Sequence, residues 1–135
     1  MTDQPGTAAA AARLLLIEDD RFLRKAAEVM LRKQGFQVIA AADGEAGVEA
    51  AREHLPDAIL CDLIMPKLQG FEVIERLKQD ARTAAIPVVV MSNLGQESDV
   101  QHAMDAGAVA YVVKSNVALQ ELGDRIRAVL AARAF

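Results

Sequence analysis

The sequence PDAILCDLIMPKLQG occupies residues 56–70 and is the most informative segment of the chain. Its apolar run from Ala58 to Cys61 is short and does not alternate with polar residues, which is typical of a strand covered on both faces of a sheet. Asp62 follows this run directly. Because a carboxylate at the end of a buried strand is costly to desolvate unless it is paired or takes part in chemistry, Asp62 is the first candidate functional residue.

Polar side chains accompany the other strand-like runs in the same way. They are Glu18, Asp19 and Asp20 after the run 14–17, Ser92 after the run 87–91, Tyr111 within the run 109–113, and Lys114 after it. In open parallel sheets, ligands bind at the carboxyl ends of the strands. We therefore expect these side chains to share one edge of a sheet and to form the functional site.

The segments between these runs have the pattern of helices. The predicted strands are 13–17, 36–41, 57–61, a strand opened by Pro87, and 109–113; the predicted helices are 20–34, 43–54, 71–80, 96–106 and a last helix capped by Asn116. Five strands alternating with five helices predict a single α/β domain with a doubly wound parallel sheet and helices on both faces.

Two of the helices show buried stripes, and their ends carry capping residues. The stripe of the first helix is Leu23, Ala26, Ala27, Met30 and Leu31, and that of the last is Leu119, Leu122, Ile126, Val129 and Leu130. Asp20 and Asp43 are predicted to cap helix N-termini, and Gly35 is predicted to end the first helix in a left-handed conformation.

Composition limits the class of protein. The 135 residues are 53% hydrophobic and 4% aromatic, so the core should be aliphatic, and a net charge of −4 does not support direct binding of nucleic acid. The single cysteine excludes an internal disulfide, and its position in an apolar run predicts that Cys61 is a packed core thiol. No apolar stretch approaches the roughly 18 residues that span a bilayer, so membrane insertion is not expected.

The first twelve residues contain Asp3 and no basic residue, which does not match a secretory signal. We predict a disordered leader at 1–12, with a short helical extension as the alternative, and a domain at 13–133, in a cytoplasmic protein. Asp57 is predicted to begin its strand roughly 16 Å from Asp62, too far to share a site. His54 and His102 lie in polar helical surroundings and are predicted to be solvated.

Five motifs in order resemble the response regulator receiver domain, the CheY-like family of two-component signalling. They are LLLIEDD (14–20), AADGEAGVEA (41–50), PDAILCDLIMPKLQGFE (56–72), IPVVVMS (86–92) and AGAVAYVVK (106–114). The resemblance covers Arg13 to Leu130. It implies a flavodoxin-like fold with strand order 2-1-3-4-5.

The resemblance also implies a role for each candidate residue. Asp62 would be the phosphoacceptor, Glu18, Asp19, Asp62 and the backbone carbonyl of Ile64 would hold Mg²⁺, Ser92 and Lys114 would hold phosphoryl oxygens, and Ser92 with Tyr111 would form the switch. The residue types agree with this chemistry. Clustered carboxylates repel one another unless a cation lies among them, and hard oxygen ligands suit Mg²⁺. A carboxylate can also act as the nucleophile that forms an acyl phosphate.

The function implied is signalling by phosphoryl transfer. A sensor histidine kinase or a phosphotransfer protein would donate from a phosphohistidine, and slow self-hydrolysis would remove the group without any external substrate. An output protein of unknown identity would then bind the changed surface. The chain is expected to be a monomer or a phosphorylation-dependent dimer, either complete or as the receiver part of a larger hybrid kinase or regulator.

Three other classes fit the residues less well. An aspartate-nucleophile phosphatase usually has a second acid two residues after the nucleophile, and this chain has Ile64 there. A flavin or nucleotide binder needs a phosphate-binding loop after the first strand, where the acidic residues 18–20 would repel phosphate. A receiver that never takes phosphate is disfavoured because every chemical position is filled.

The sequence departs from the family at three positions. Ser115 replaces the usual proline after the lysine, Asn93 replaces a small residue after Ser92, and Glu18 replaces an aspartate. Two further side chains, Ile64 and Leu94, are predicted to flank the path of the hydrolytic water. Since neither can hydrogen-bond a water, we expect a long-lived phosphorylated state.

Overall fold

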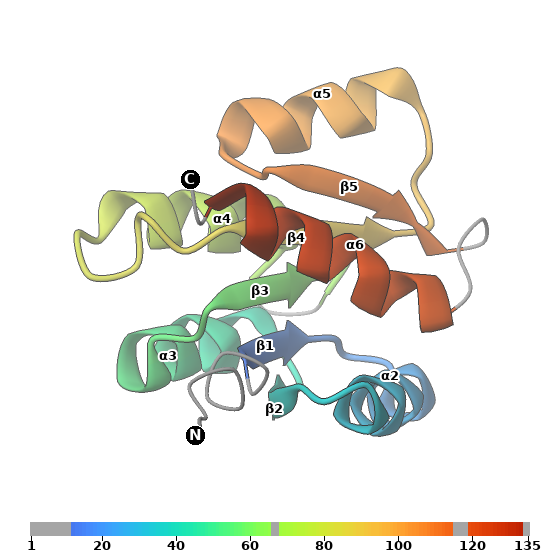
Figure 1. Ribbon diagram of the computed structural model, residues 1–135. Coiled ribbons are helices and arrows are strands. Elements are labelled where there is room, and N and C mark those ends of the chain that lie inside the picture. Colours follow the sequence, from blue (N-terminus) through green and yellow to red (C-terminus); the bar gives the residue numbers. More distant parts are fainter. Residues whose placement is uncertain (1–11, 66–67, 115–118, 134–135) are drawn as a thin grey trace.

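The structure is a computed structural model that describes residues 12–65, 68–114 and 119–133 (Figure 1). Within these residues, five parallel strands are hydrogen-bonded in the order β2-β1-β3-β4-β5, so the predicted fold class and strand order are confirmed. The strands are β1 (Arg13–Ile17), β2 (Gln37–Ala41), β3 (Ala58–Cys61), β4 (Val88–Ser92) and β5 (Ala110–Val113). The helices are α2 (Arg21–Lys33), α3 (Gly44–His54), α4 (Gly70–Gln79), α5 (Glu97–Ala106) and α6 (Leu119–Arg133).

Helices cover both faces of the sheet because successive strand residues point to opposite sides. Leu15 and Ile17 pack with α3, α4 and α5 on one face, whereas Leu14 and Leu16 pack with α2 and α6 on the other (Figure 1). All four side chains are fully buried. Burying a leucine or isoleucine contributes about 1.5–3 kcal/mol, so these apolar runs stabilise both layers.

The helix ends confirm the predicted caps. The Asp20 carboxylate accepts hydrogen bonds from two backbone N–H groups in the first turn of α2, at 2.9 and 3.0 Å. The Asp43 carboxylate accepts one from the N–H of Ala46 at 2.8 Å. Gly35 follows α2 with a φ of 100°, a conformation that side-chain-bearing residues rarely adopt. These residues fix where the chain leaves and re-enters the sheet.

One prediction about burial was wrong. Ala26 is exposed, although Ala27 and Leu31 are fully buried, because α2 meets the sheet and α6 along a face centred on the latter two. Ala12, which we assigned to the leader, packs against the core. Its carbonyl accepts a hydrogen bond from the N–H of Gln37 at 2.9 Å, which extends the contact between the first two strands.

The other differences concern element boundaries. β2, β3, β4 and β5 each begin one residue later than predicted, at Gln37, Ala58, Val88 and Ala110. In α6, Leu122 and Ile126 are buried as predicted, and the other three predicted residues are half-buried. The leader residues 1–11, the departure at Ser115 and the cap at Asn116 lie outside the described residues.

Candidate functional site

The acidic residues meet at the carboxyl ends of β1 and β3, which are neighbours in the sheet. The N–H of Asp62 donates to the carbonyl of Ile17, and the N–H of Glu18 donates to the carbonyl of Ala41, both at 3.1 Å. Carboxylate oxygens of Glu18, Asp19 and Asp62 all lie within 4.8 Å of one another. The sheet thus joins two acidic segments that are more than forty residues apart in the chain.

Lys114 joins this cluster from the end of β5. Its Nζ lies 2.7 Å from Oε1 of Glu18 and 3.0 Å from Oδ2 of Asp62. Glu18 is fully buried, and the side chains of Asp62 and Lys114 are only 7% and 14% exposed. Because buried charges are tolerated only when they are paired, the ammonium is required for this arrangement.

Burial and crowding shift the protonation of this cluster. Burial raises the pKa of the Glu18 carboxyl, and the charge of Asp62 adds to the effect, although the hydrogen bonds from Lys114 and from the backbone of Asp20 oppose it. Burial opposes the ammonium form of Lys114, but its hydrogen bonds to the two carboxylates outweigh burial and raise the pKa of Lys114. The site therefore favours an additional cation or proton among its carboxylates.

Ser92 and Tyr111 lie on adjacent strands and are connected through Leu94. Ser92 is fully buried, and its hydroxyl oxygen accepts a hydrogen bond from the N–H of Leu94 at 3.2 Å. The half-buried Tyr111 donates its hydroxyl to the carbonyl of Leu94. Burial also raises the pKa of Tyr111. The loop after β4 therefore holds the tyrosine hydroxyl, while the ring packs against the core only in part.

The loop after Asp62 is fixed from both sides. The N–H of Ile64 donates to Oδ1 of Asp62 at 3.2 Å, and the N–H of Gly70 donates to the carbonyl of Leu63 at 2.9 Å. A Cβ at Gly70 would lie 2.4 Å from the carbonyl oxygen of Asp62, so only glycine permits this approach of α4. Leu63 is buried, whereas Ile64 is 55% exposed beside the carboxylate.

Comparison with known proteins decides the family. The sequence model of one protein family, the response regulator receiver domain, matches residues 14–127. This chain is a receiver domain of that family. The protein PilH of Pseudomonas aeruginosa is 39% identical over 120 residues, which cover 89% of this chain and 98% of PilH. A solved response regulator from Chloroflexus aurantiacus superposes with a TM-score of 0.84 at 31% identity, over 90% of this chain and 98% of that one.

Longer regulators are also similar to this receiver domain. The transcriptional regulatory protein AfsQ1 of Streptomyces coelicolor is 43% identical over 117 residues, which cover 87% of this chain and 50% of AfsQ1. The chain thus spans about half the length of such relatives. Like its relatives, the receiver domain is a signalling module of two-component systems.

No helix among the described residues is long and apolar enough to cross a membrane.

The acidic cluster of the receiver domain could bind a metal ion. Glu18, Asp19 and Asp62 offer hard oxygen ligands close together, and the exposed Asp19 leaves the cluster open to solvent. The three residues predicted from the sequence as side-chain ligands are therefore brought together. The fourth predicted ligand, the carbonyl of Ile64, belongs to the same loop as Asp62.

Other polar residues have structural roles in the receiver domain. The carboxylate of Asp57 accepts a hydrogen bond from the N–H of Arg13 at 2.8 Å, at the amino end of the sheet. Cys61 is fully buried, and burial raises the pKa of its thiol, as expected for a core residue. His102 is exposed as predicted, but its ring also stacks on Phe71, with ring centroids 3.8 Å apart. Sequence reasoning missed this contact between α4 and α5.

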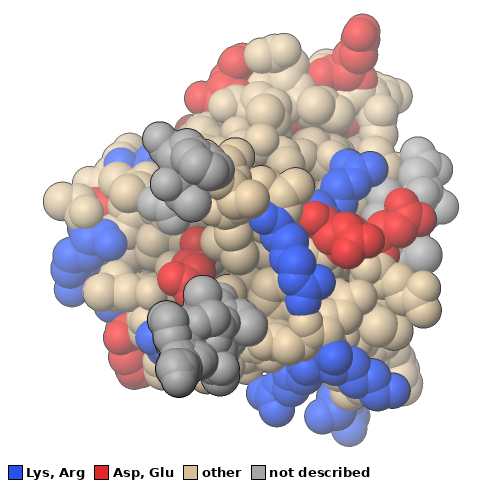
Figure 2. Space-filling view, in the orientation of Figure 1, with Lys and Arg blue, Asp and Glu red and all other residues tan. Residues whose placement is uncertain are grey.

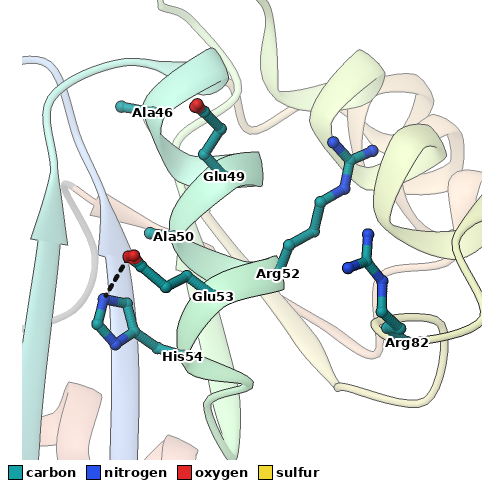
Figure 3. A pocket seen from close by; sticks show the side chains of 7 residues that line it. All are labelled: Ala46, Glu49, Ala50, Arg52, Glu53, His54 and Arg82. Atoms are coloured by element: carbon teal, nitrogen blue, oxygen red, sulfur yellow. Dashed lines mark ion pairs between the residues drawn. The ribbon is translucent and has the colours of Figure 1, made fainter.

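A hollow of about 540 Å³ lies outside the site, on the outer surface of α3 (Figure 3). Arg52 and Arg82 extend toward each other beside it, and His54 pairs with Glu53 at 3.6 Å on the other side of the helix. Asp80 contacts both arginines, at 3.0 and 3.1 Å, and hydrogen bonds from Arg82 lower the pKa of Asp80 to about 2. Asp80, together with Glu49 and Glu53 in the lining of the hollow, therefore offsets the two arginine charges locally, so the arginines do not mark an anion site.

Proposed function

We propose that Asp62 accepts a phosphoryl group from the phosphohistidine of a sensor histidine kinase or a phosphotransfer protein. The observation that carries this proposal is the ammonium of Lys114, held between the buried carboxylates of Glu18 and Asp62. A lysine in this position can pair with the carboxylate of Asp62 before transfer and with an oxygen of the phosphoryl group after transfer. Phosphoryl transfer depends mainly on such positioning and charge compensation.

The transfer itself exchanges one bond for another. A carboxylate oxygen of Asp62 forms a bond to phosphorus while the phosphorus–nitrogen bond of the donor breaks, and the imidazole nitrogen that leaves keeps the electron pair and takes up a proton. Lys114 and the hydroxyl of Ser92 hold oxygens of the transferred group. Its loss by self-hydrolysis transfers the group to water, so no external substrate is required.

Mg²⁺ is the metal ion we propose for the acidic cluster. Asp19 and Asp62 would bind it directly, Glu18 would act through water, and the carbonyl of Ile64 would complete the protein ligands. The ion would neutralise negative charge on the phosphoryl oxygens when bound. The raised pKa of Glu18 and the proximity of the three carboxylates support a cation at this position.

The signal would leave through α5, β5 and α6. Once Asp62 carries a phosphoryl group, Ser92 would turn its hydroxyl toward it, release the N–H of Leu94 and vacate space for Tyr111 to turn from solvent toward the core. A ligand shifts such an equilibrium only if it binds one state better. The unknown output protein would read this surface in the cytoplasm, with the receiver as a monomer or a phosphorylation-dependent dimer. The relatives allow either a free-standing receiver or a part of a larger regulator.

The test is incubation with Mg²⁺ and acetyl phosphate, followed by intact-mass spectrometry. The wild-type chain should gain one acid-labile phosphoryl group, Asp62→Asn should gain none, and Asp19→Asn should need much more Mg²⁺. Asp57→Asn is the matched control, because it removes a carboxylate from the other end of the same strand, and it should be labelled normally. Labelling of Asp62→Asn would overturn the assignment.

The route of the signal is tested by amide NMR on the same phosphorylated sample. Changes should concentrate in α5, β5 and α6. Changes confined to Leu23–Gly35 would contradict this output surface.

A further inference from the structure

Arg24 differs from the other basic residues of its helix. Figure 2 shows Lys and Arg side chains gathered over α2. The basic residues of this helix are Arg21, Arg24, Lys25, Arg32 and Lys33. Four of them are exposed, but Arg24 is half-buried and turned back toward the start of the helix. A partly buried guanidinium is stabilised by hydrogen-bond partners, and those of Arg24 lie in the acidic loop.

The partners of Arg24 are the backbone carbonyls that carry the acidic pair. Its Nη1 donates to the carbonyl of Glu18 at 2.9 Å and to that of Asp19 at 3.3 Å. Two further hydrogen bonds hold the same loop. The N–H of Glu18 donates to the carbonyl of Ala41, and the N–H of Asp20 donates to Oε2 of Glu18. Among these hydrogen bonds, those from Arg24 are made by a side chain that does not belong to the acidic residues 18–20.

We infer that Arg24 is a positioning residue for the proposed metal and phosphoryl site. By holding the peptide units of Glu18 and Asp19, it sets the direction in which the exposed Asp19 carboxylate leaves the backbone. Mg²⁺ demands near-ideal octahedral geometry, so a rotation of this peptide would weaken binding. Contacts that orient metal ligands typically change metal affinity 10–100-fold when they are removed. The inference rests on the proposed function, because it concerns the same site.

The position of the Arg24 guanidinium, and not its charge alone, should determine its effect on metal affinity. Both contacts come from Nη1 at the end of a rigid planar guanidinium, whereas the ammonium of a lysine is a compact point charge with a different reach. A role in stability alone predicts that Arg24 variants unfold more easily but bind the metal ion normally once folded. The two interpretations therefore differ in metal affinity measured on folded protein.

The experiment measures binding of Mn²⁺ by electron paramagnetic resonance, and of Mg²⁺ by competition, for Arg24→Ala and Arg24→Lys. Arg21→Ala is the matched control, because it removes the same charge from the first turn of the same helix at an exposed position. We expect affinity to fall roughly tenfold or more in Arg24→Ala and less in Arg24→Lys. Arg21→Ala should stay within about twofold of wild type, since exposed charges are screened.

A metal-free measurement separates this inference from the proposed function. Amide hydrogen exchange at Asp20, whose N–H is bonded to Glu18, should accelerate in Arg24→Ala and not in Arg21→Ala. Wild-type protein that binds no Mn²⁺ would refute the proposed metal site, and the exchange data would still decide whether Arg24 holds the loop. Normal metal affinity in folded Arg24→Ala, or an equal loss in Arg21→Ala, would overturn the inference. If Arg24→Ala does not fold, Arg24→Lys decides by the same criteria.

Discussion

Glu18 is buried, and each of its carboxylate oxygens has a partner. Oε1 contacts Nζ of Lys114 at 2.7 Å, and Oε2 accepts a hydrogen bond from the N–H of Asp20 at 3.0 Å. These contacts do not fully compensate for burial and for the charge of Asp62, since the pKa of Glu18 stays raised. Burying such a carboxylate lowers the stability of the fold, because the carboxylates of the site are arranged for binding and not for stability.

Glu18→Gln should therefore stabilise the metal-free protein at neutral pH. A carboxyl whose pKa is raised in the folded state contributes stability below its unfolded pKa, near 4.5, and this stability is lost as pH rises through the folded pKa. We expect the variant to gain on the order of 1 kcal/mol relative to wild type at pH 8, and little at pH 4. Urea denaturation in EDTA at the two pH values measures the difference, with the exposed Glu45→Gln as control. A variant that is less stable than wild type at pH 8 would contradict the prediction.

Ile64 and Leu94 should set how long the phosphoryl group persists. Ile64 is 55% exposed beside Asp62, and Leu94 is half-buried beside Ser92. Neither side chain can orient a water, whereas positioned polar groups typically accelerate such steps about 10²-fold. The double variant Ile64→Asn with Leu94→Glu should lose the group roughly tenfold faster or more, measured by intact mass over time. Equal lifetimes would show that these residues do not control hydrolysis.

At the scale of the elements, α4 is attached to the phosphoacceptor loop at its first residue. Gly70 begins α4 and donates its N–H to the carbonyl of Leu63. Phe71, the next residue, stacks on His102 of α5. The loop contacts α4 and α4 contacts α5, so movement of the loop should change the position of α5.

Gly70→Ala should disrupt this attachment. Its Cβ would lie 2.4 and 2.6 Å from backbone atoms of Asp62 and Leu63, which cannot yield as a flexible side chain would. We expect a loss of about 1–3 kcal/mol in the free energy of unfolding, together with slower phosphorylation of Asp62. Gly95→Ala is the matched control, because its nearest neighbour, Val113, would be at 3.6 Å, and it should change stability by about 0.5 kcal/mol or less. Comparable losses in both variants would mean that the close approach at Gly70 is not responsible.

At the scale of the whole molecule, the site lies where two packed layers end. The two hydrophobic clusters fill opposite faces of the sheet, and the charged residues collect at the edge that neither layer covers. Ligands of open α/β sheets bind at this edge because the crossovers on either side of it leave a crevice. The fold and the site are therefore coupled: the acidic cluster exists only when β1 and β3 are paired.

Mg²⁺ should accordingly stabilise the whole fold. An ion that binds only the folded state adds about 2.7 kcal/mol at a concentration 100 times its dissociation constant. We expect the melting temperature to rise with MgCl₂, and the rise to be much smaller in Asp19→Asn, because one of the proposed ligands is lost. Calorimetry with NaCl at matched ionic strength is the control. An equal rise with NaCl would indicate screening of the acidic cluster and not binding.

The helices and strands, and the edge at which the polar residues collect, could be predicted from the amino-acid pattern. Apolar runs such as 58–61 and the caps Asp20 and Asp43 act locally, so their structure could be predicted from neighbouring residues. The strand order came from the resemblance to receiver domains, because a pattern of strands and helices does not specify which strands are neighbours. The predicted burial of Ala26 was wrong for a related reason, since periodicity does not show how wide the contact with α6 is.

Which side chains meet at the site depends on how the elements pack in three dimensions. Lys114 lies 96 residues from Glu18, and the two become partners because β1, β3, β4 and β5 end at one edge. The contact of Arg24 with the acidic loop and the stack of Phe71 on His102 likewise had no signal in the sequence. Such contacts depend on the direction of long side chains after the elements have packed, and burial then decides which charges must be paired.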